Sequence, residues 1–474
     1  MPVSEAEVLT WCERLIEPAT KIPPFEQCLE TIPTLAELAD LPAGTRVLVR
    51  GDLDVVVDED GRVGNDARLR SLVPTLTEGG RRGWVQLVYG HRGRDPELSL
   101  RAVSEHLGEL LPADARGDRA VAFIDDWLDD ETGEVTESAA RQLASLADGS
   151  VAVLENTRRD SLERVLWNAG PEDLDDLVPR LTCYVNSIAE RLARVHVNEA
   201  LAASNRDLSS TLVPLAADRV ALGHTIHREL STHLARTRQA ELVVFSGIKI
   251  NKLDDLEQII ARGTVRMVIA AGGLALALKR ADALRDGSEF ELGLAGDPAH
   301  GKIFIPPERI EQSRRMLDAG RDAGVEFVLP VDFVLGDHSV SGSIPDNQAQ
   351  FDVGPQTIDL QAQAVDRFLE FHRRRQADGA GPAVAFHNGV FGKFEEDPFG
   401  EGTRAFIGQL KRMHDTGVAV YVGGGEGSTA LLRYGQESWV THCFTAGGTI
   451  LKALGNEAIP YLKALWMKGE QVDG

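Results

Sequence analysis

The sequence predicts an α/β protein built from two doubly wound domains, each with a parallel sheet between layers of helices. Two observations support this prediction. Short apolar, β-branched runs alternate with helical stretches from about residue 34 onward, an order that is typical of parallel sheets. The chain also has 474 residues, more than the roughly 250–300 at which a single hydrophobic core stops growing.

Candidate strands fall into two groups on either side of a helical stretch at 216–238. Helical stretches such as 138–146 separate successive strands within each group. The candidates in the first group are 46–50, 85–89, 120–124, 151–154 and 183–186, and those in the second group are 242–245, 267–271, 326–330, 383–386 and 418–422.

Residues 1–33 are expected to form an added N-terminal segment. Ser4 and Glu7 have the spacing of a capping box, which predicts a short helix over 5–16. The rest of the chain is expected to divide into a first domain at 34–215, an interdomain helix or hinge at 216–238, a second domain at 239–450, and a segment at 451–474 that returns to the first domain.

The composition, with 43% hydrophobic and 26% charged residues, is that of a globular protein. A formal net charge of −23 argues against binding to nucleic acid or to an anionic membrane surface. The longest apolar run, 267–278, is too short to span a bilayer. The four cysteines are far apart and lack metal-ligand spacing. We therefore expect a soluble, cytoplasmic protein without nucleic-acid or membrane partners.

Glycine-rich turns follow two strand candidates of the second half. VGGGEG at 422–427 follows one strand, and NGVFG at 388–392 follows another. Glycine exposes backbone N–H groups and permits positive φ, and the N-terminus of a following helix favours phosphate. No Gly-Lys-Ser/Thr follows, so neither turn is a Walker loop. A tight strand-to-helix turn without a ligand explains one such glycine run equally well.

Arginines follow four strand positions of the first half. They occur in GDLD at 51–54 with NDARLR at 65–70, in GHRGR at 90–94, in ENTRR at 155–159 and in NRD at 205–207. One such loop would be a solvated surface. Because parallel strands bring these loops to one edge, four of them predict a cradle for a small polyanion. Asp52 can orient the arginines or accept a hydrogen bond from a substrate hydroxyl.

With these motifs in order, the chain resembles the phosphoglycerate kinase family over about residues 34–470. The motifs that carry the resemblance are spread along the chain. They are VLVRGDLD at 47–54, GHRGR at 90–94, FIDD at 123–126, LENTR at 154–158, YVN at 184–186, VNEA at 197–200, LPVD at 329–332, DVGPQT at 352–357, NGVFG at 388–392, GGG at 423–425 and AGG at 446–448.

The resemblance implies two Rossmann-like domains with different ligands. The domain at 34–215 would bind 3-phosphoglycerate in a basic patch, and the domain at 239–450 would bind ATP or ADP with Mg²⁺. Hinge closure would then allow reversible transfer of the γ-phosphoryl group to the substrate carboxylate, giving an acyl phosphate. The implied partners are a small anionic carboxylate and a nucleotide, and the implied oligomeric state is a monomer.

The resemblance also assigns site residues. Arg68 would stabilise the transferring phosphoryl group, and Lys249 would contact it, so these two are the expected catalytic residues. Positions that match the acceptor site are Asp52, Asp54, Arg68, His91, Arg94, Arg158 and Arg206. Positions that match the nucleotide site are Lys249, Gly272, Gly273, Asn388, Glu395 (the expected ribose partner), Gly424, Gly425, Glu426 (the expected metal ligand), Gly427 and Ser428.

On the acceptor side, the chain departs from the family pattern at several positions. Asp54 replaces an asparagine and places a second carboxylate beside a site meant for an anion, which should weaken binding unless the carboxylate is paired or protonated. Asn205 and Leu208 replace histidines, and Arg92 replaces an apolar residue.

On the nucleotide side, Glu426 replaces the aspartate that holds the metal, and its extra methylene shifts the ligand geometry. Gly427 stands where a threonine or serine would donate to phosphate, a role that Ser428 could take. Ala446 replaces a glycine, and the spacing from Lys249 to Lys252 is one residue short.

Three functions are compatible with these residues. The first is an ATP-dependent kinase of 3-phosphoglycerate or a close phospho- or phosphono-carboxylate, favoured by the arginine set and Lys249. The second is a divergent kinase of another carboxylate in specialised biosynthesis, favoured by four departures: Asp54, Arg92, Asn205 and Leu208. The third is a non-catalytic scaffold or ligand sensor, with 1–33 binding a partner. For either kinase, no general base is required, because a carboxylate with a pKa near about 4 is already ionised.

Overall fold

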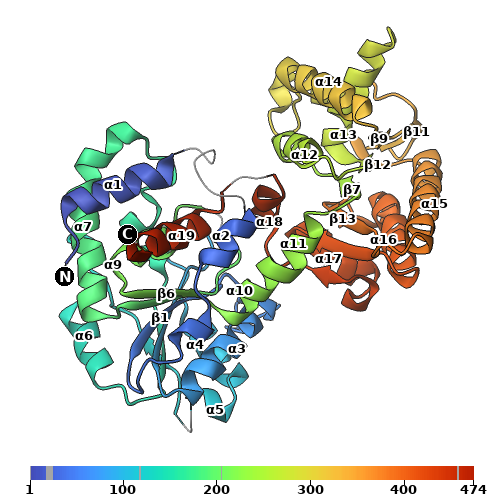
Figure 1. Cartoon of the computed structure of the whole chain (residues 1–474). Coiled ribbons are helices and arrows are strands. Elements are labelled where there is room, and N and C mark those ends of the chain that lie inside the picture. The colour runs from blue at the N-terminus through green and yellow to red at the C-terminus, as the bar shows by residue number, and fades with distance from the viewer. Residues whose placement is uncertain (1, 18–24, 117–118, 204, 456–457, 474) are drawn as a thin grey trace. The chain divides into compact units, whose positions relative to one another are not determined.

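The structure is a computed structural model that describes residues 2–17, 25–116, 119–203, 205–455 and 458–473 (Figure 1). Its contacts divide the chain into two units. We call Met1–Thr232 with Glu457–Gly474 unit 1, and His233–Asn456 unit 2. Each unit is built on a six-stranded parallel sheet, as the sequence predicts. Within the described residues, no helix combines the length and the apolar character needed to cross a membrane.

The sheet of unit 1 has the strand order β3-β4-β2-β1-β5-β6. Neighbouring residues of β1 belong to different cores: Val47 and Val49 pack into one, and Leu48 packs into the other. A sheet buried on both faces explains why its strands read as continuous apolar runs. The strands are β1 (Arg46–Arg50), β2 (Val85–Tyr89), β3 (Ala122–Ile124), β4 (Val151–Leu154), β5 (Val195–Asn198) and β6 (Arg219–Leu222).

The predicted N-terminal helix is confirmed as α1 (Glu5–Ile16). The Ser4 side chain accepts from the backbone of Glu7, and the Glu7 side chain returns a bond to Ser4, which completes the capping box. Val8, Trp11, Cys12 and Leu15 are buried on one face of α1, and the helix packs against α7 (Leu174–Arg191). The N-terminal segment therefore contributes to the core of unit 1.

The C-terminal helix, α19 (Pro460–Asp473), belongs to unit 1 and packs against α2, α8 and α9. The helices of unit 1 besides α1, α7 and α19 are α2 (Phe25–Thr31), α3 (Ala67–Arg81), α4 (Arg101–Leu110), α5 (Ala113–Arg116), α6 (Glu137–Ala144), α8 (Leu208–Thr211), α9 (Val213–Ala216) and α10 (His224–Arg228).

Two secondary-structure predictions in unit 1 are wrong. Residues 183–186, expected as a strand, lie inside α7, because the buried side chains of α7 recur at helical spacing over the longer window: Leu174, Val178, Leu181, Val185 and Ile188. The helix expected at 216–238 is interrupted, because 219–222 form β6 and the helical segment starts only at His224.

The sheet of unit 2 has the order β15-β14-β13-β7-β8-β9. A small antiparallel sheet, which the sequence analysis did not predict, is formed by β10 (Phe333–Leu335), β11 (Val340–Ser341) and β12 (Gln350–Val353). The remaining strands are β7 (Leu242–Phe245), β8 (Met267–Ala270), β9 (Glu326–Val328), β13 (Val384–Asn388), β14 (Ala419–Gly423) and β15 (His442–Cys443). The helices are α11 (Ala235–Thr237), α12 (Lys252–Ala261), α13 (Gly272–Arg285), α14 (Pro307–Asp322), α15 (Pro355–Ala377), α16 (Glu401–Asp415), α17 (Gly425–Tyr434) and α18 (Gly447–Leu454).

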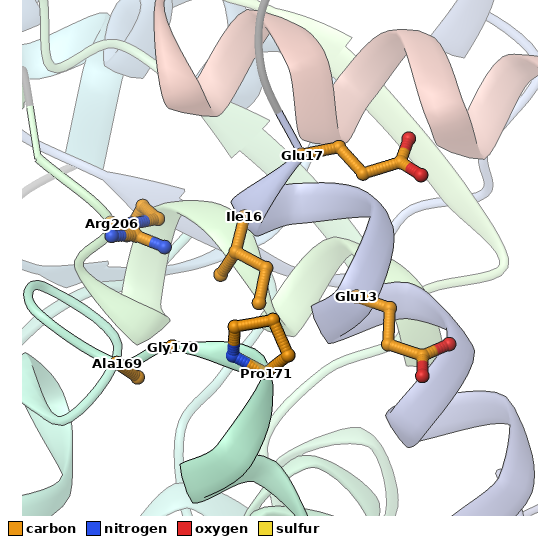
Figure 2. A pocket seen from close by; sticks show the side chains of 7 residues that line it. All are labelled: Glu13, Ile16, Glu17, Ala169, Gly170, Pro171 and Arg206. Atoms are coloured by element: carbon orange, nitrogen blue, oxygen red, sulfur yellow. The ribbon is translucent and has the colours of Figure 1, made fainter.

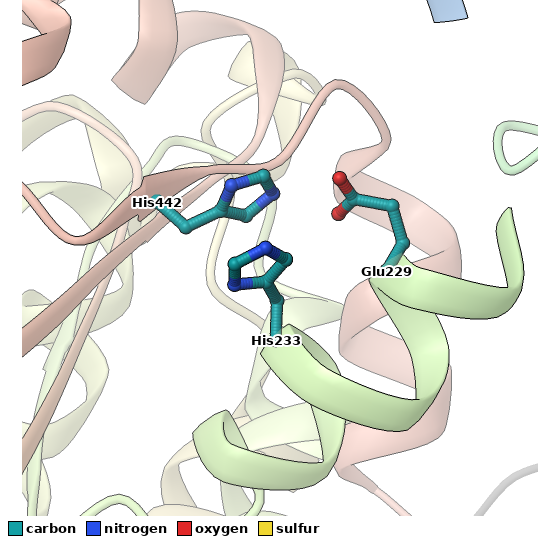
Figure 3. A group of neighbouring side chains, drawn as sticks. All are labelled: Glu229, His233 and His442. Carbon is teal, nitrogen blue, oxygen red and sulfur yellow. The ribbon is translucent and has the colours of Figure 1, made fainter. Parts of the chain in front are cut away.

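The helical segment that enters unit 2 contains a π-helical turn, Glu229–Leu234, between α10 and α11. In unit 2 the ring of His233 stacks on that of His442 in β15, with a centroid separation of 3.8 Å and an interplanar angle of 5°. Figure 3 shows the two rings together with Glu229, which precedes His233 on the same helical segment. This stack connects the start of unit 2 to an edge strand of its sheet.

A buried carboxyl group in unit 2 makes stability depend on pH. Asp352 is only 1% exposed. Its side chain accepts hydrogen bonds from the backbone N–H groups of Val353 and Gly402, both at 2.9 Å. Loss of hydration raises the pKa of Asp352 from 3.8 to about 7, and the two hydrogen bonds oppose this rise.

We expect Asp352→Asn to cost less stability at pH 8 than at pH 6. Because the folded-state pKa lies above the unfolded one, the protonated carboxyl contributes stability that is complete below pH 3.8 and is lost as the pH rises through about 7. Between pH 6 and 8 the wild type should lose about 1 kcal/mol relative to the variant. Urea unfolding of both proteins at the two pH values measures this. A difference independent of pH, or equal to that of the exposed control Asp359→Asn, would contradict the expectation.

Candidate active site

The acceptor side of the candidate site lies in unit 1, where β4, β2, β1 and β5 are neighbours and end at one edge of the sheet. Arg68, in the first turn of α3, reaches the two aspartates that follow β1. Its Nη1 lies 3.5 Å from Asp52 Oδ1 and 3.3 Å from Asp54 Oδ2, and it donates to the Asp54 carbonyl at 2.9 Å. The Arg68 side chain remains 28% exposed. The Arg68 guanidinium is thus held in a fixed position by two aspartates, on a side chain that is partly exposed.

Asp54, the second carboxylate beside the expected anion site, is paired with groups of the protein. Asp54 Oδ2 faces Arg68, and Asp54 Oδ1 accepts a hydrogen bond from the backbone N–H of Gly93 at 2.7 Å. The neighbouring Arg92 turns away, and its side chain donates to the carbonyls of Val55 and Ser99. Asp54 therefore joins the loop after β1 to the loop after β2.

His91 is a neutral member of the site. Its Nδ1 lies 2.9 Å from Nη2 of Arg50, a buried arginine at the end of β1. Because a guanidinium only donates, His91 Nδ1 must accept, and its proton sits on Nε2. Burial and the charges of Arg50 and Arg158 hold the pKa of His91 well below its ordinary value. His91 is therefore a hydrogen-bond donor and adds no positive charge.

Arg158, after β4, is held by three kinds of contact. Its Nη1 donates to the Gly93 carbonyl at 2.6 Å, its guanidinium lies 5.1 Å above the Trp167 ring, and its Nη2 lies 3.9 Å from Asp207 Oδ2. Trp167 also donates from Nε1 to Asp207 Oδ1 at 2.7 Å. The aromatic ring and the carboxylate together fix the guanidinium.

Within the described residues, the side chains of two predicted arginines make no hydrogen bond or ion pair with the acceptor-side cluster. Arg206 Nη2 donates to the Trp167 carbonyl at 2.8 Å, and Arg206 lines a cavity of about 580 Å³ beside the end of α1. Figure 2 shows its guanidinium directed toward Ile16. Arg94 has an exposed side chain, and its carbonyl accepts a hydrogen bond from Arg164. The close cluster consists instead of Asp52, Asp54, Arg68, His91 and Arg158, with Arg50 and Asp207.

The nucleotide side of the candidate site is a cavity of about 310 Å³ in unit 2. It opens where β7, β8 and β13 end, and its walls are mostly apolar, as suits a planar ring system. Gly272, with φ +64°, starts α13 against the turn after β7, and a Cβ there would lie 3.0 Å from the Gly247 backbone. The lining includes Gly272, Gly273, Leu276, Leu292, Ile303, Phe351, Val390, Lys393, Glu395 and Glu426.

The glycine turn after β14 leads directly into α17. Gly424 is the residue before the helix and has φ +89°, which permits the sharp turn. Glu426, in the first turn, lines the cavity, whereas Gly424, Gly425, Gly427 and Ser428 are not part of its lining. The Ser428 hydroxyl donates to the Gly424 carbonyl at 3.0 Å, so its proton points back into the helix. Glu426 is the residue of this turn that places a carboxylate at the cavity.

The two lysines after β7 have different surroundings. Lys249 is exposed, and it does not line the cavity. Lys252, the first residue of α12, donates from Nζ to the Ser246 carbonyl and to Asn388 Oδ1, both at 3.1 Å. Burial lowers the pKa of Lys252, and the Glu426 carboxylate opposes that shift. The cation beside Asn388 is therefore the half-buried Lys252, which donates to Asn388 Oδ1.

Gly427→Thr should strengthen nucleotide binding. Gly427 has a helical backbone, and an added Cβ would lie 3.4 Å from Val422 Cγ1 and 3.6 Å from the Gly389 nitrogen, which are ordinary contacts. A hydroxyl in the first turn of α17 can donate to a phosphate, and one such bond gives about a tenfold gain in affinity. Calorimetric titration with Mg-ADP measures it. Gly408→Thr, in open space on α16, is the matched control; equal affinities for the two variants would contradict the expectation.

Sequence reasoning missed several residues that shape both half-sites. Asp207 directly follows Arg206 in the NRD motif at 205–207, and its place in that motif is the only sequence feature that indicates a role in the site. Arg50 is the last residue of an apolar strand candidate, and its place at that strand end is likewise the only sequence feature that indicates a role in the site. The sequence gives no sign that Trp167, within a segment of 3₁₀ turns, lies under Arg158. Lys252 stands one residue short of the family spacing from Lys249, so the sequence pattern assigns it no role.

Comparison with known proteins places these half-sites in a family. The family model described as phosphoglycerate kinase matches residues 38–457. The phosphoglycerate kinase of Streptomyces griseus subsp. griseus is 31% identical over 446 residues, which cover 90% of this chain and 98% of that protein. That of Salinibacter ruber is 31% identical over 448 residues, with 89% and 96% covered.

Solved structures agree on the fold. The structure of phosphoglycerate kinase from Pyrococcus horikoshii superposes with a TM-score of 0.68 at 21% identity, covering 92% of this chain and 99% of that one. The structure from Coxiella burnetii gives a TM-score of 0.66 at 23% identity. The chain therefore belongs to the phosphoglycerate kinase family, whose members are phosphotransferases with a carboxyl group as acceptor.

Proposed function

We propose that the protein transfers the γ-phosphoryl group of Mg-ATP to the carboxylate of 3-phosphoglycerate or a closely related phospho- or phosphono-carboxylate, forming an acyl phosphate. The observation that carries this proposal is Arg68, a partly exposed guanidinium fixed between Asp52 and Asp54 where β1 ends. The names of the relatives, phosphoglycerate kinases, support the choice of acceptor.

Phosphoryl transfer requires positive charge at a defined position beside the transferring group. A transferring phosphoryl group carries charge on its equatorial oxygens, and a guanidinium stabilises that charge. Arg68 supplies it, and the Nε2 proton of neutral His91 can donate to an acceptor oxygen. The acceptor carboxylate is already ionised at neutral pH, so the protein needs no general base. Catalysis then rests on orientation, charge neutralisation and exclusion of water.

The residues of unit 2 suit a magnesium nucleotide. The apolar cavity accepts a ring, Gly272 allows close approach of backbone, and Lys252 and Glu426 offer a cation and an oxygen ligand near the glycine turn. Bound Mg²⁺ neutralises phosphate charge. Since the two half-sites belong to different units, we propose that hinge closure brings them together during turnover.

The test is phosphorus NMR of the protein with Mg-ATP and 3-phosphoglycerate, with hydroxylamine added to trap acyl phosphate. Substrate-dependent ADP formation together with trapped product would support the proposed function. If Mg-ATP binds but no product forms, the acceptor is a different carboxylate. If nucleotide does not bind at all, the protein is a non-catalytic scaffold, and the proposal is wrong.

A further inference from the structure

Two buried guanidinium groups of the acceptor site share one buried carboxylate of the chain. Asp207 Oδ2 lies 3.6 Å from Arg50 Nη2 and 3.9 Å from Arg158 Nη2. The Asp207 side chain is only 1% exposed, and the indole of Trp167 holds its other oxygen by a 2.7 Å hydrogen bond. Asp207 is therefore fixed beside both guanidinium groups and offsets their positive charge.

A second buried carboxylate, that of Glu163, is connected to Arg50 through Ser209. Glu163 accepts hydrogen bonds from the Ser209 backbone at 3.0 Å and from Ser209 Oγ at 2.5 Å, and Ser209 Oγ in turn accepts from Arg50 Nε at 2.8 Å. Burial and the nearby Asp207 carboxylate raise the pKa of Glu163 to about 7. Arg50 thus meets the Asp207 carboxylate directly and, through Ser209, a Glu163 carboxyl group that is only partly ionised near pH 7.

The three guanidinium groups of this cluster consequently face carboxyl groups of the protein before any ligand binds. Arg68 faces Asp52 and Asp54, Arg158 faces Asp207, and Arg50 faces Asp207 directly and Glu163 through Ser209. His91 is neutral. A phosphomonoester carries about −1.5 to −2 charges at neutral pH. Beside a buried aspartate, in a region of low dielectric, such a group meets strong repulsion.

We propose that Asp207 is a specificity-determining residue, whose buried carboxylate lowers the affinity of the acceptor site for the dianionic phosphate group of a phospho-carboxylate. This inference rests on the proposed function, because it concerns the acceptor of the same reaction. It deepens that function by naming a charge limit on the acceptor and the residue that imposes it.

The decisive variant is Asp207→Asn, which keeps an oxygen for the Trp167 hydrogen bond and removes the charge. Calorimetric titration without nucleotide compares two probes, 3-phosphoglycerate and glycerate, which differ by the phosphate group. We expect the variant to bind 3-phosphoglycerate about tenfold more tightly than the wild type, and to bind glycerate within about twofold of it. Asp218→Asn, which removes an aspartate from a surface pair with Arg194, is the matched control and should change neither affinity.

Glu163→Gln provides a second variant in case Asp207→Asn does not fold, and it should change affinity in the same direction. Unchanged 3-phosphoglycerate affinity in a folded variant, or an equal gain for glycerate, would overturn the role of Asp207. The titration also separates this inference from the proposed function. A selective gain in 3-phosphoglycerate affinity without any turnover would support Asp207 as the specificity residue and count against the reaction. Binding of neither probe to any variant would overturn both.

Discussion

Replacing Arg68 with alanine should reduce turnover by roughly a thousandfold while the protein stays folded, because an arginine at a transferring phosphoryl group contributes about 10³ or more to kcat. The fold should persist because Asp54 keeps its hydrogen bond from Gly93, and because Arg68 is 28% exposed and lies outside the cores. Initial rates with Mg-ATP and 3-phosphoglycerate measure the effect, and circular dichroism checks the fold.

Two further variants make the result specific to the guanidinium. Arg70→Ala lies on the same helix and loses only a surface pair with Asp66, so it should retain near-normal turnover. Arg68→Lys keeps the charge but loses the planar fork, and it should recover only part of the rate. A rate for Arg68→Ala within a few-fold of the wild type would remove Arg68 from its assigned role.

The fold was largely predictable because its strands are buried on both faces. The runs that become β1, β2 and β4 lack an alternation of polar and apolar residues, as expected for strands buried on both faces. Where the prediction failed, a short strand-like run lay inside a longer stretch with helical spacing, and the helical spacing decided the structure. Residues 183–186 combine an aromatic and a β-branched side chain, yet they continue the helical spacing of α7. The short strands β10, β11 and β12 lie between longer elements and leave little pattern.

The candidate site was predictable only as far as topology decides it. Strand ends at one edge bring Asp52, His91 and Arg158 near one another whatever their side chains do. Which atoms meet depends on side-chain direction. Asp207 and Trp167 are 40 residues apart, and their contact follows from how 3₁₀ turns and loops pack together. The contact of Lys252 with Asn388 follows from the point at which α12 starts, an element boundary that sequence patterns locate poorly.

A different kind of constraint acts at Gly389, and Gly389→Ala should destabilise unit 2 by about 2–5 kcal/mol. Gly389 follows β13 with φ +98°, in the left-handed region that disfavours a side chain. An added Cβ would lie 2.2 Å from the Ser246 carbonyl oxygen and 2.7 Å from its carbon. That backbone cannot move freely, because the Ser246 nitrogen donates to the Asn388 carbonyl at 2.9 Å between paired strands.

Three glycines of unit 2 allow the two costs at Gly389 to be separated. Gly379 has φ +76° with open space around its Cβ position, so Gly379→Ala should cost about 1 kcal/mol from backbone strain alone. Gly408 lies in α16 with open space and helical backbone, so Gly408→Ala should be neutral or stabilising. Urea unfolding of the three variants should give the order Gly408, Gly379, Gly389 in increasing loss. If Gly389→Ala cost no more than Gly379→Ala, the close approach of the turns after β7 and β13, on which the nucleotide cavity depends, would be wrong.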